Sequence, residues 1–215
     1  MRTISVGHSP DADDIFMYYA IKFGWVSLPK VKFKNIALDI ETLNQATLKG
    51  IYDICAISFA LYPFVKDDFA LLKTAVSFGE GYGPKLIKKK GAKLKKNFKV
   101  ALSGEFTTNA LLFKIAYPDA RISYMNFLDI ENAVINGDVD AGVLIHESIL
   151  TYSSLLEVER EIWDIWVELC NGEELPLPLG GMCLRRSITL TEAIKYENVL
   201  IKAVDVANKN RKTLA

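Results

Sequence analysis

Short apolar runs alternate along this chain with segments whose apolar residues have helical spacing. A short run rich in Val, Ile and Leu is typical of a buried strand, whereas apolar residues at i, i+3 and i+4 indicate a helix. Their alternation predicts parallel sheets with helices on both sides. The expected strands are 3–7, 32–38, 52–57, 69–76, 99–102, 121–125, 140–145 and 182–184. One expected helix begins near residue 15, and the others span 40–48, 59–65, 109–116, 129–135, 156–170 and 191–208.

The two halves of the chain have the same kind of pattern, strands and helices with polar residues at the strand ends. The lysine-rich segment 88–97 is the best candidate for a domain boundary, and residues 176–181, P-L-P-L-G-G, are expected to break regular structure. The chain is expected to return near residue 187. These observations predict a two-lobed α/β protein with a cleft between the lobes, lobe I being 1–96 plus 188–215 and lobe II 97–187.

One apolar run ends on a candidate catalytic residue. Residues 140–145 are predicted to form a central strand, and His146, Glu147 and Ser148 follow it directly. Ligands of open α/β sheets bind at the carboxyl ends of the strands, and an imidazole titrates near pH 6.5, so His146 is a candidate acid or base. A buried core or helix-capping histidine is the alternative.

Three further corners join a strand end to a predicted helix. They carry Ser9 and Asp14, then Ser58, then Thr107 with Thr108. Hydroxyls and free N–H groups at a helix start suit an anionic or hydroxyl-rich ligand, although such residues also serve as simple helix caps. The aspartates of D-A-D-D lack the spacing of a calcium loop, so no metal is expected.

Charge and cysteine content exclude several classes of function. The 215 residues carry 26 basic and 26 acidic side chains, and this balance argues against a nucleic-acid partner, because such proteins usually have a basic surplus. The lysines from 88 to 96 are expected to form a solvated loop. Three cysteines without C-x-x-C spacing predict neither a disulfide framework nor a zinc site. With no apolar segment typical of a signal peptide or a membrane span, we expect a cytoplasmic protein without a membrane partner.

Five motifs together resemble one enzyme family, the 1,4-dihydroxy-6-naphthoate synthases, which act late in the futalosine route to menaquinone. The motifs are H-S-P-D-A-D-D-I-F at 8–16, D-I-E-T-L-N at 39–44, T-T at 107–108, I-H-E-S at 145–148 and L-P-L-P-L-G at 175–180. The resemblance spans nearly the whole chain in the same order.

This resemblance implies a fold like that of type II periplasmic binding proteins, with mixed sheets flanked by helices. It implies a lyase that converts cyclic dehypoxanthinyl futalosine, a small carboxylated molecule, to 1,4-dihydroxy-6-naphthoate without a metal or organic cofactor. The family's catalytic base corresponds to His146. Its substrate contacts correspond to Ala56, Ile57, Ser58, Thr107 and Thr108, to which the first corner adds Ser9 and Asp14.

Several points stay open in the sequence. Family members often have Cys-Pro-Asn where this chain has Asp11-Ala12-Asp13, and they continue for several helices beyond Ala215, which would complete lobe I. Glu147 is expected to face solvent rather than to orient His146, and Cys55 lies beside the Ser58 corner. The competing functions are a small-acid solute-binding protein of the same fold and the related chorismate dehydratase, which lacks the I-H-E-S arrangement. A monomer or a homodimer is compatible with the sequence.

Overall fold

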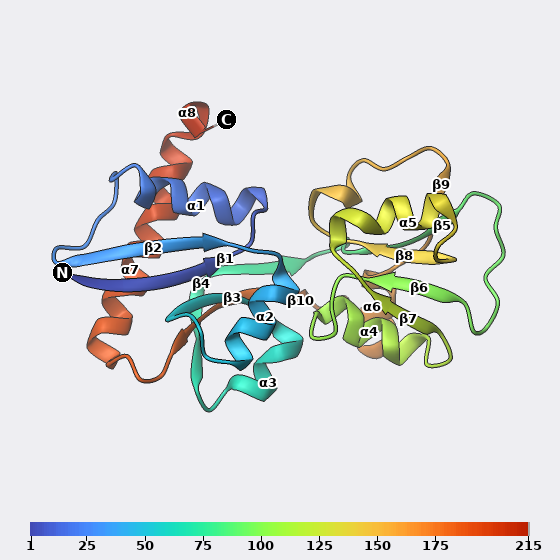
Figure 1. Ribbon diagram of the computed structural model, residues 1–215, viewed down its shortest axis with the longest axis horizontal. Coiled ribbons are helices and arrows are strands. Elements are labelled where there is room, and N and C mark those ends of the chain that lie inside the picture. The colour runs from blue at the N-terminus through green and yellow to red at the C-terminus, as the bar shows by residue number, and fades with distance from the viewer. Residues whose placement is uncertain (215) are drawn as a thin grey trace. The chain divides into compact units, whose positions relative to one another are not determined.

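The chain folds into two compact α/β units. The computed structural model describes residues 1–214, apart from the side chains of Ala12, Asp13 and Leu214. The first unit comprises residues 1–77 and 180–215, and the second comprises residues 78–179. Each unit contains one sheet of five strands flanked by helices (Figure 1). The predicted fold class, mixed sheets covered by helices, is therefore confirmed.

The sheet of the first unit has the order β2-β1-β3-β10-β4. Strand β1 pairs in parallel with β2 and β3, whereas β10 is antiparallel to β3. The strands are β1 (Arg2–His8), β2 (Val31–Ala37), β3 (Ile54–Ser58), β4 (Phe69–Gly79) and β10 (Leu177–Arg185). The helices are α1 (Ala12–Lys22), α2 (Ile40–Leu48), η1 (Phe59–Leu61), α3 (Tyr62–Val65), α7 (Leu190–Lys209) and α8 (Arg211–Leu214).

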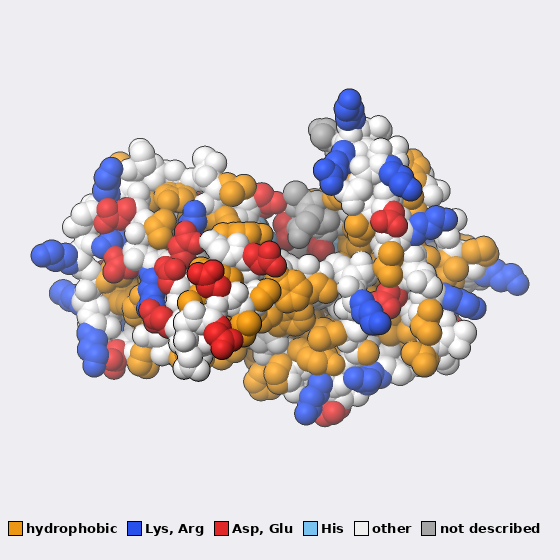
Figure 2. Space-filling model, turned by 180° about the vertical axis from the view of Figure 1, so that it is seen from behind, with side chains coloured by type: hydrophobic (Ala, Val, Ile, Leu, Met, Phe, Trp, Pro, Cys, Tyr) orange, Lys and Arg blue, Asp and Glu red, His pale blue; other side chains and the backbone are white. Residues whose placement is uncertain are grey.

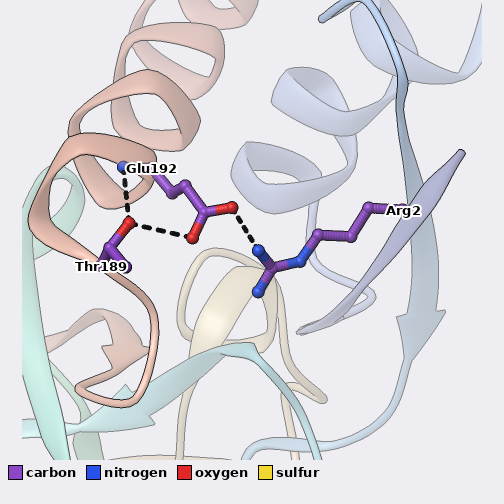
Figure 3. A network of polar contacts seen from close by, with 3 residues as sticks. All are labelled: Arg2, Thr189 and Glu192. Carbon is purple, nitrogen blue, oxygen red and sulfur yellow. Dashed lines mark hydrogen bonds and ion pairs between the residues drawn. The ribbon is translucent and has the colours of Figure 1, made fainter.

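Helix α7 is attached to this sheet at its first turn (Figure 3). Thr189 is the N-cap: its hydroxyl accepts from the Glu192 N–H at 3.4 Å and donates to the Glu192 carboxylate at 2.9 Å. That carboxylate also pairs with Arg2 at the start of β1. Thr189 therefore begins the helix, and the T-x-x-E spacing is the pattern of a capping box.

The sheet of the second unit has the order β7-β6-β8-β5-β9. Strand β6 is parallel to β7 and β8, and β5 is antiparallel to both β8 and β9. The strands are β5 (Lys85–Lys89), β6 (Lys99–Leu102), β7 (Arg121–Tyr124), β8 (Ala141–Leu144) and β9 (Leu156–Glu161). The helices are α4 (Thr108–Ala116), η2 (Phe127–Asp129), α5 (Ile130–Asn136), η3 (His146–Ile149) and α6 (Ile162–Leu169).

Helix α5 packs very closely on β8, the strand that precedes His146. A Cβ atom on Gly142 would lie 2.4 Å from Ile130 Cγ2 and 3.1 Å from Val134 Cγ2. Both contacting side chains are fully buried in the core of this unit. Glycine at this position therefore sets the distance between α5 and the centre of the sheet.

Three sequence predictions about elements are wrong. Residues 156–170 form strand β9 followed by α6 rather than one helix, because the alternation L-E-V-E-R-E suits a half-exposed strand. The lysine-rich segment begins within β5, where Lys88 pairs with Glu159 at 2.5 Å. The second unit begins at residue 78, and the predicted boundary after residue 96 therefore lies inside it. Strand β10 begins at Leu177 and continues through Pro178 and Gly180, where a break was expected.

The surface of the protein carries both signs of charge. Figure 2 shows acidic and basic side chains interspersed on the face that it presents. Within the described part of the chain, no helix has the length and apolar character needed to cross a bilayer.

Candidate functional site

Polar residues collect at one edge of the first unit's sheet. Because β1 and β3 are parallel, the residues at their carboxyl ends, His8 and Ser58, lie at the same edge. Antiparallel β10 brings Gly180 opposite Ser58. A Cβ on Gly180 would lie only 2.8 Å from the Ile57 carbonyl oxygen, so glycine permits this close pairing. The predicted corners at Ser9 and Ser58 thus belong to one edge.

The Ser58 corner is tied to helix α2 by Asn44. The Ser58 N–H donates to Asn44 Oδ1 at 3.0 Å, and Asn44 Nδ2 donates to Ser58 Oγ at 3.1 Å. Asn44 is 0% exposed, and Ser58 is 4% exposed. Ala56 and Ile57, predicted as substrate contacts, are also buried, so any contact that they make to a ligand is expected to involve the backbone.

The first loop is held by its own polar groups. The Ser9 N–H donates to Asp14 Oδ2 at 2.8 Å, across the start of α1. His8 Nδ1 lies 2.8 Å from the Ser9 carbonyl oxygen, and the His8 ring stacks on Tyr18. Ser9 and His8 are both buried. Asp13, also considered as a polar group of this loop, has a side chain outside the described residues.

The Thr107–Thr108 corner lies in the second unit, between β6 and α4. Thr107 is the N-cap of α4, and its hydroxyl accepts from the Ala110 N–H at 3.4 Å. The same hydroxyl lies 2.9 Å from both Gly104 O and Asn109 Oδ1. The Thr108 hydroxyl donates to the Leu179 carbonyl at 2.8 Å. The capping interpretation is thus confirmed for Thr107, and the N–H groups of the first turn of α4 lie at this corner.

His146 lies at the same edge of the second unit's sheet as this corner, because β8 and β6 are parallel. It begins η3 with φ of 54°, a left-handed conformation. Such a backbone is unusual for a residue with a Cβ, costs about 1–2 kcal/mol and is often found where function constrains the chain. The His146 ring meets the edge of Phe127, with 5.1 Å between centroids.

The neighbours of His146 define the rest of this turn. The Ser148 hydroxyl donates to the Ile145 carbonyl and closes the turn. Glu147 is exposed, as the sequence predicts for a residue that faces solvent. His146 is partly buried as a residue, and its Nε2 atom is shielded from solvent. An imidazole held in this way is positioned by the protein around it, as an acid or base must be.

The two cysteines in the first unit's sheet have unreactive thiols. Cys55 is fully buried, and this burial raises the pKa of its thiol to about 12. Cys183 lies opposite Cys55 in β10, and burial raises the pKa of that thiol well above its usual range. Both thiols therefore stay protonated near neutral pH, as expected of small buried apolar side chains.

A separate cavity of about 360 Å³ lies in the first unit. Its lining includes Phe64, Arg185 and Arg186. Arg185 donates its N–H to the Asp53 carbonyl, at the amino end of β3, so the cavity lies at the edge of the sheet opposite to Ser58. It is therefore distinct from the corners predicted to contact substrate. Among the described residues, no group of His, Cys, Asp and Glu is arranged to hold a metal ion.

Sequence reasoning missed His8, Asn44 and Asn109. His8 appears in the sequence only as the first residue of the motif at 8–16, although it is one of two histidines in the chain and ends a strand. Asn44 was noted only as part of the D-I-E-T-L-N motif. A polar residue on the apolar face of a short helix was the available signal, because a buried amide needs a partner.

The fold belongs to a known class. The chain resembles the alkanesulfonate-binding protein SsuA of Xanthomonas axonopodis pv. citri, with a TM-score of 0.70, 12% identity and coverage of 99% of this chain and 76% of that one. It is thus a periplasmic-binding-protein-like α/β protein. A crystallised protein of Archaeoglobus fulgidus, AF1704, is more similar, with a TM-score of 0.89, 34% identity and coverage of 97% and 78% of the two chains.

The sequence comparisons identify the family. A family model described as menaquinone biosynthesis matches residues 4–215, and the chain belongs to this family. The 1,4-dihydroxy-6-naphthoate synthase of Thermus thermophilus is 31% identical over 191 residues, which cover 87% of this chain and 68% of that protein. The resemblance predicted from the five motifs is therefore confirmed.

Proposed function

We propose that this protein is a lyase that converts cyclic dehypoxanthinyl futalosine to 1,4-dihydroxy-6-naphthoate. The proposal is supported by the family and by the name of the Thermus thermophilus relative. The observation that carries it is the placement of His146, which follows β8 at the sheet edge and adopts a left-handed backbone. The protein would act on a small carboxylated molecule in the cytoplasm.

In this proposal, neutral His146 is the general base. It removes a proton from a carbon next to an activating group of the substrate, and the sugar-derived fragment leaves as the second ring becomes aromatic. A well-placed base typically accelerates such a step about 100-fold to 10,000-fold. The ring contact with Phe127 limits the orientations of the imidazole, so less ordering is needed when substrate binds.

The polar corners are proposed to bind the substrate. In the second unit, N–H groups at the start of α4 beside Thr107 and Thr108 are suited to a carboxylate or to developing negative charge. In the first unit, Ser58 and Ser9 offer polar groups at the sheet edge, with Asp14 holding the loop. Donors of this kind bind an acid without a lysine, which fits a chain of zero net charge.

Turnover of the proposed substrate tests this function directly. Product formation would be followed by absorbance and mass for the wild type, His146→Ala and the matched control Glu147→Gln. We expect the first substitution to reduce kcat at least about 100-fold. We expect the control to retain the wild-type rate, because Glu147 is exposed.

Other outcomes would each reject part of the proposal. Turnover that survives His146→Ala would keep the enzyme and discard His146 as the base. If the wild type makes no product but binds a small acid tightly, a solute-binding protein of this fold becomes the better description. Dehydration of chorismate would instead favour the related dehydratase.

A further inference from the structure

His8 is a second histidine held in one orientation at a sheet edge. It ends β1, and its ring stacks on Tyr18 with 4.2 Å between centroids and 26° between planes. Tyr18 is itself 2% exposed, and its hydroxyl lies 3.9 Å from Met182 Sδ. The ring of His8 therefore rests on a well-packed support and has little freedom to rotate.

The hydrogen bond of His8 determines which ring nitrogen carries the proton. Nδ1 lies 2.8 Å from the Ser9 carbonyl oxygen. A carbonyl oxygen can only accept, so Nδ1 must be the donor, and in the neutral ring Nε2 must then be an acceptor. Burial lowers the pKa of His8, while the Ser9 carbonyl and the charge of Asp11 oppose that shift. The ring is thus neutral at physiological pH.

The second ring nitrogen of His8, Nε2, is an acceptor that has no donor within the described part of the chain. A buried ring with one satisfied nitrogen and one lone pair at a ligand-binding edge is suited to a neutral donor such as a hydroxyl. It is unsuited to a carboxylate, which has no proton to donate when ionised.

We propose that His8 Nε2 accepts a hydrogen bond from a sugar-derived hydroxyl group of the substrate. His8 would then be a specificity-determining binding residue, separate from the base. This inference rests on the proposed function. The acceptor of His8 selects a ligand that has the hydroxyl, because an analogue without this group leaves Nε2 unpaired.

Two substitutions of His8 separate this role from a purely structural one. His8→Asn keeps an N–H near the position of Nδ1, which can still donate to the Ser9 carbonyl, but removes Nε2. His8→Phe keeps the ring that stacks on Tyr18 and removes both nitrogens. Thermal unfolding identifies any variant that fails to fold, and the other variant then carries the test.

The readout is binding of two ligands, the substrate and the aromatic product, by titration calorimetry, together with KM and kcat. The product lacks the sugar-derived hydroxyls. We expect both variants to bind substrate about 3- to 10-fold more weakly, with a matching rise in KM, and to bind product with unchanged affinity. A loss of affinity for the substrate alone supports the inference, since damage to the fold would weaken the binding of both ligands.

Unchanged substrate affinity, or an equal loss for substrate and product, would overturn the role of His8 while leaving the lyase intact. If the wild type neither binds nor converts the substrate, the proposed function fails, and the inference about His8 fails with it.

Discussion

The pair formed by Asn44 and Ser58 allows a quantitative test of how the first sheet edge is built. Replacing Asn44 with Ala removes two hydrogen bonds, of 3.0 and 3.1 Å, from a site where the two residues are 0% and 4% exposed. The Ser58 N–H is then left buried without its partner. An unsatisfied buried polar group costs about 1–3 kcal/mol, and the smaller side chain adds a cavity. We expect a loss of about 2–4 kcal/mol in the free energy of unfolding.

Ser58→Ala should cost less than Asn44→Ala. It removes only the hydroxyl, so the bond from the Ser58 N–H to Asn44 Oδ1 remains, and the expected loss is about 1–2 kcal/mol. The double variant should lose less than the sum of the two single losses, by about 1 kcal/mol, because both substitutions break the same bond.

Urea denaturation monitored by circular dichroism measures these differences. Asn97→Ala is the matched control, since this exposed asparagine should change stability by less than about 0.5 kcal/mol. A loss below about 0.5 kcal/mol for Asn44→Ala, or strictly additive effects in the double variant, would refute the argument that this pair holds the corner.

Three further outcomes follow from burial and packing. Gly142→Ala should reduce stability by about 1–3 kcal/mol in urea unfolding, because its Cβ would lie 2.4 Å from Ile130 Cγ2; wild-type stability would show that α5 moves freely. A thiol reagent at pH 8 should label Cys170, which is partly exposed, and spare Cys55, whose pKa is about 12; labelling that persists in native Cys170→Ser would contradict this. Because burial lowers the pKa of His8, the unfolded chain binds more protons, so stability should fall as the pH drops below about 6.5. His8→Phe should lose that part of the pH dependence. If the free energy of unfolding depended on pH between 7 and 5 in the same way for His8→Phe and for the wild type, that result would argue against a buried neutral ring.

The elements with strong periodicity agree with their sequence predictions. Helix α2 spans Ile40–Leu48 as expected, and β6 spans Lys99–Leu102. The errors occur where local signals compete with pairing. Strand β10 continues through Gly180 and Gly181 because pairing with β3 overrides the local tendency of glycine to break a strand.

The candidate site shows the same division. The order of strands and polar residues along the chain was enough to nominate Ser58 at the edge of one sheet and Thr107 with His146 at the edge of the other, because parallel strands within a sheet place their carboxyl ends at one edge. The roles of these residues in binding and catalysis stay predictions. The sequence could not reveal that Asn44 satisfies Ser58, since this bond joins a helix to a strand end across the core.

The sequence by itself determined the class of fold, the family and the candidate base. Each depends on the types of residue and on their order, which local patterns and motifs record. Only the tertiary structure decided which atoms are committed to holding the site together and which can accept a ligand. His8 is the clearest case: a neighbouring carbonyl and a stacked ring determine its tautomer. Hydrogen bonding and burial of this kind depend on distances between folded segments, and local sequence patterns do not give these distances.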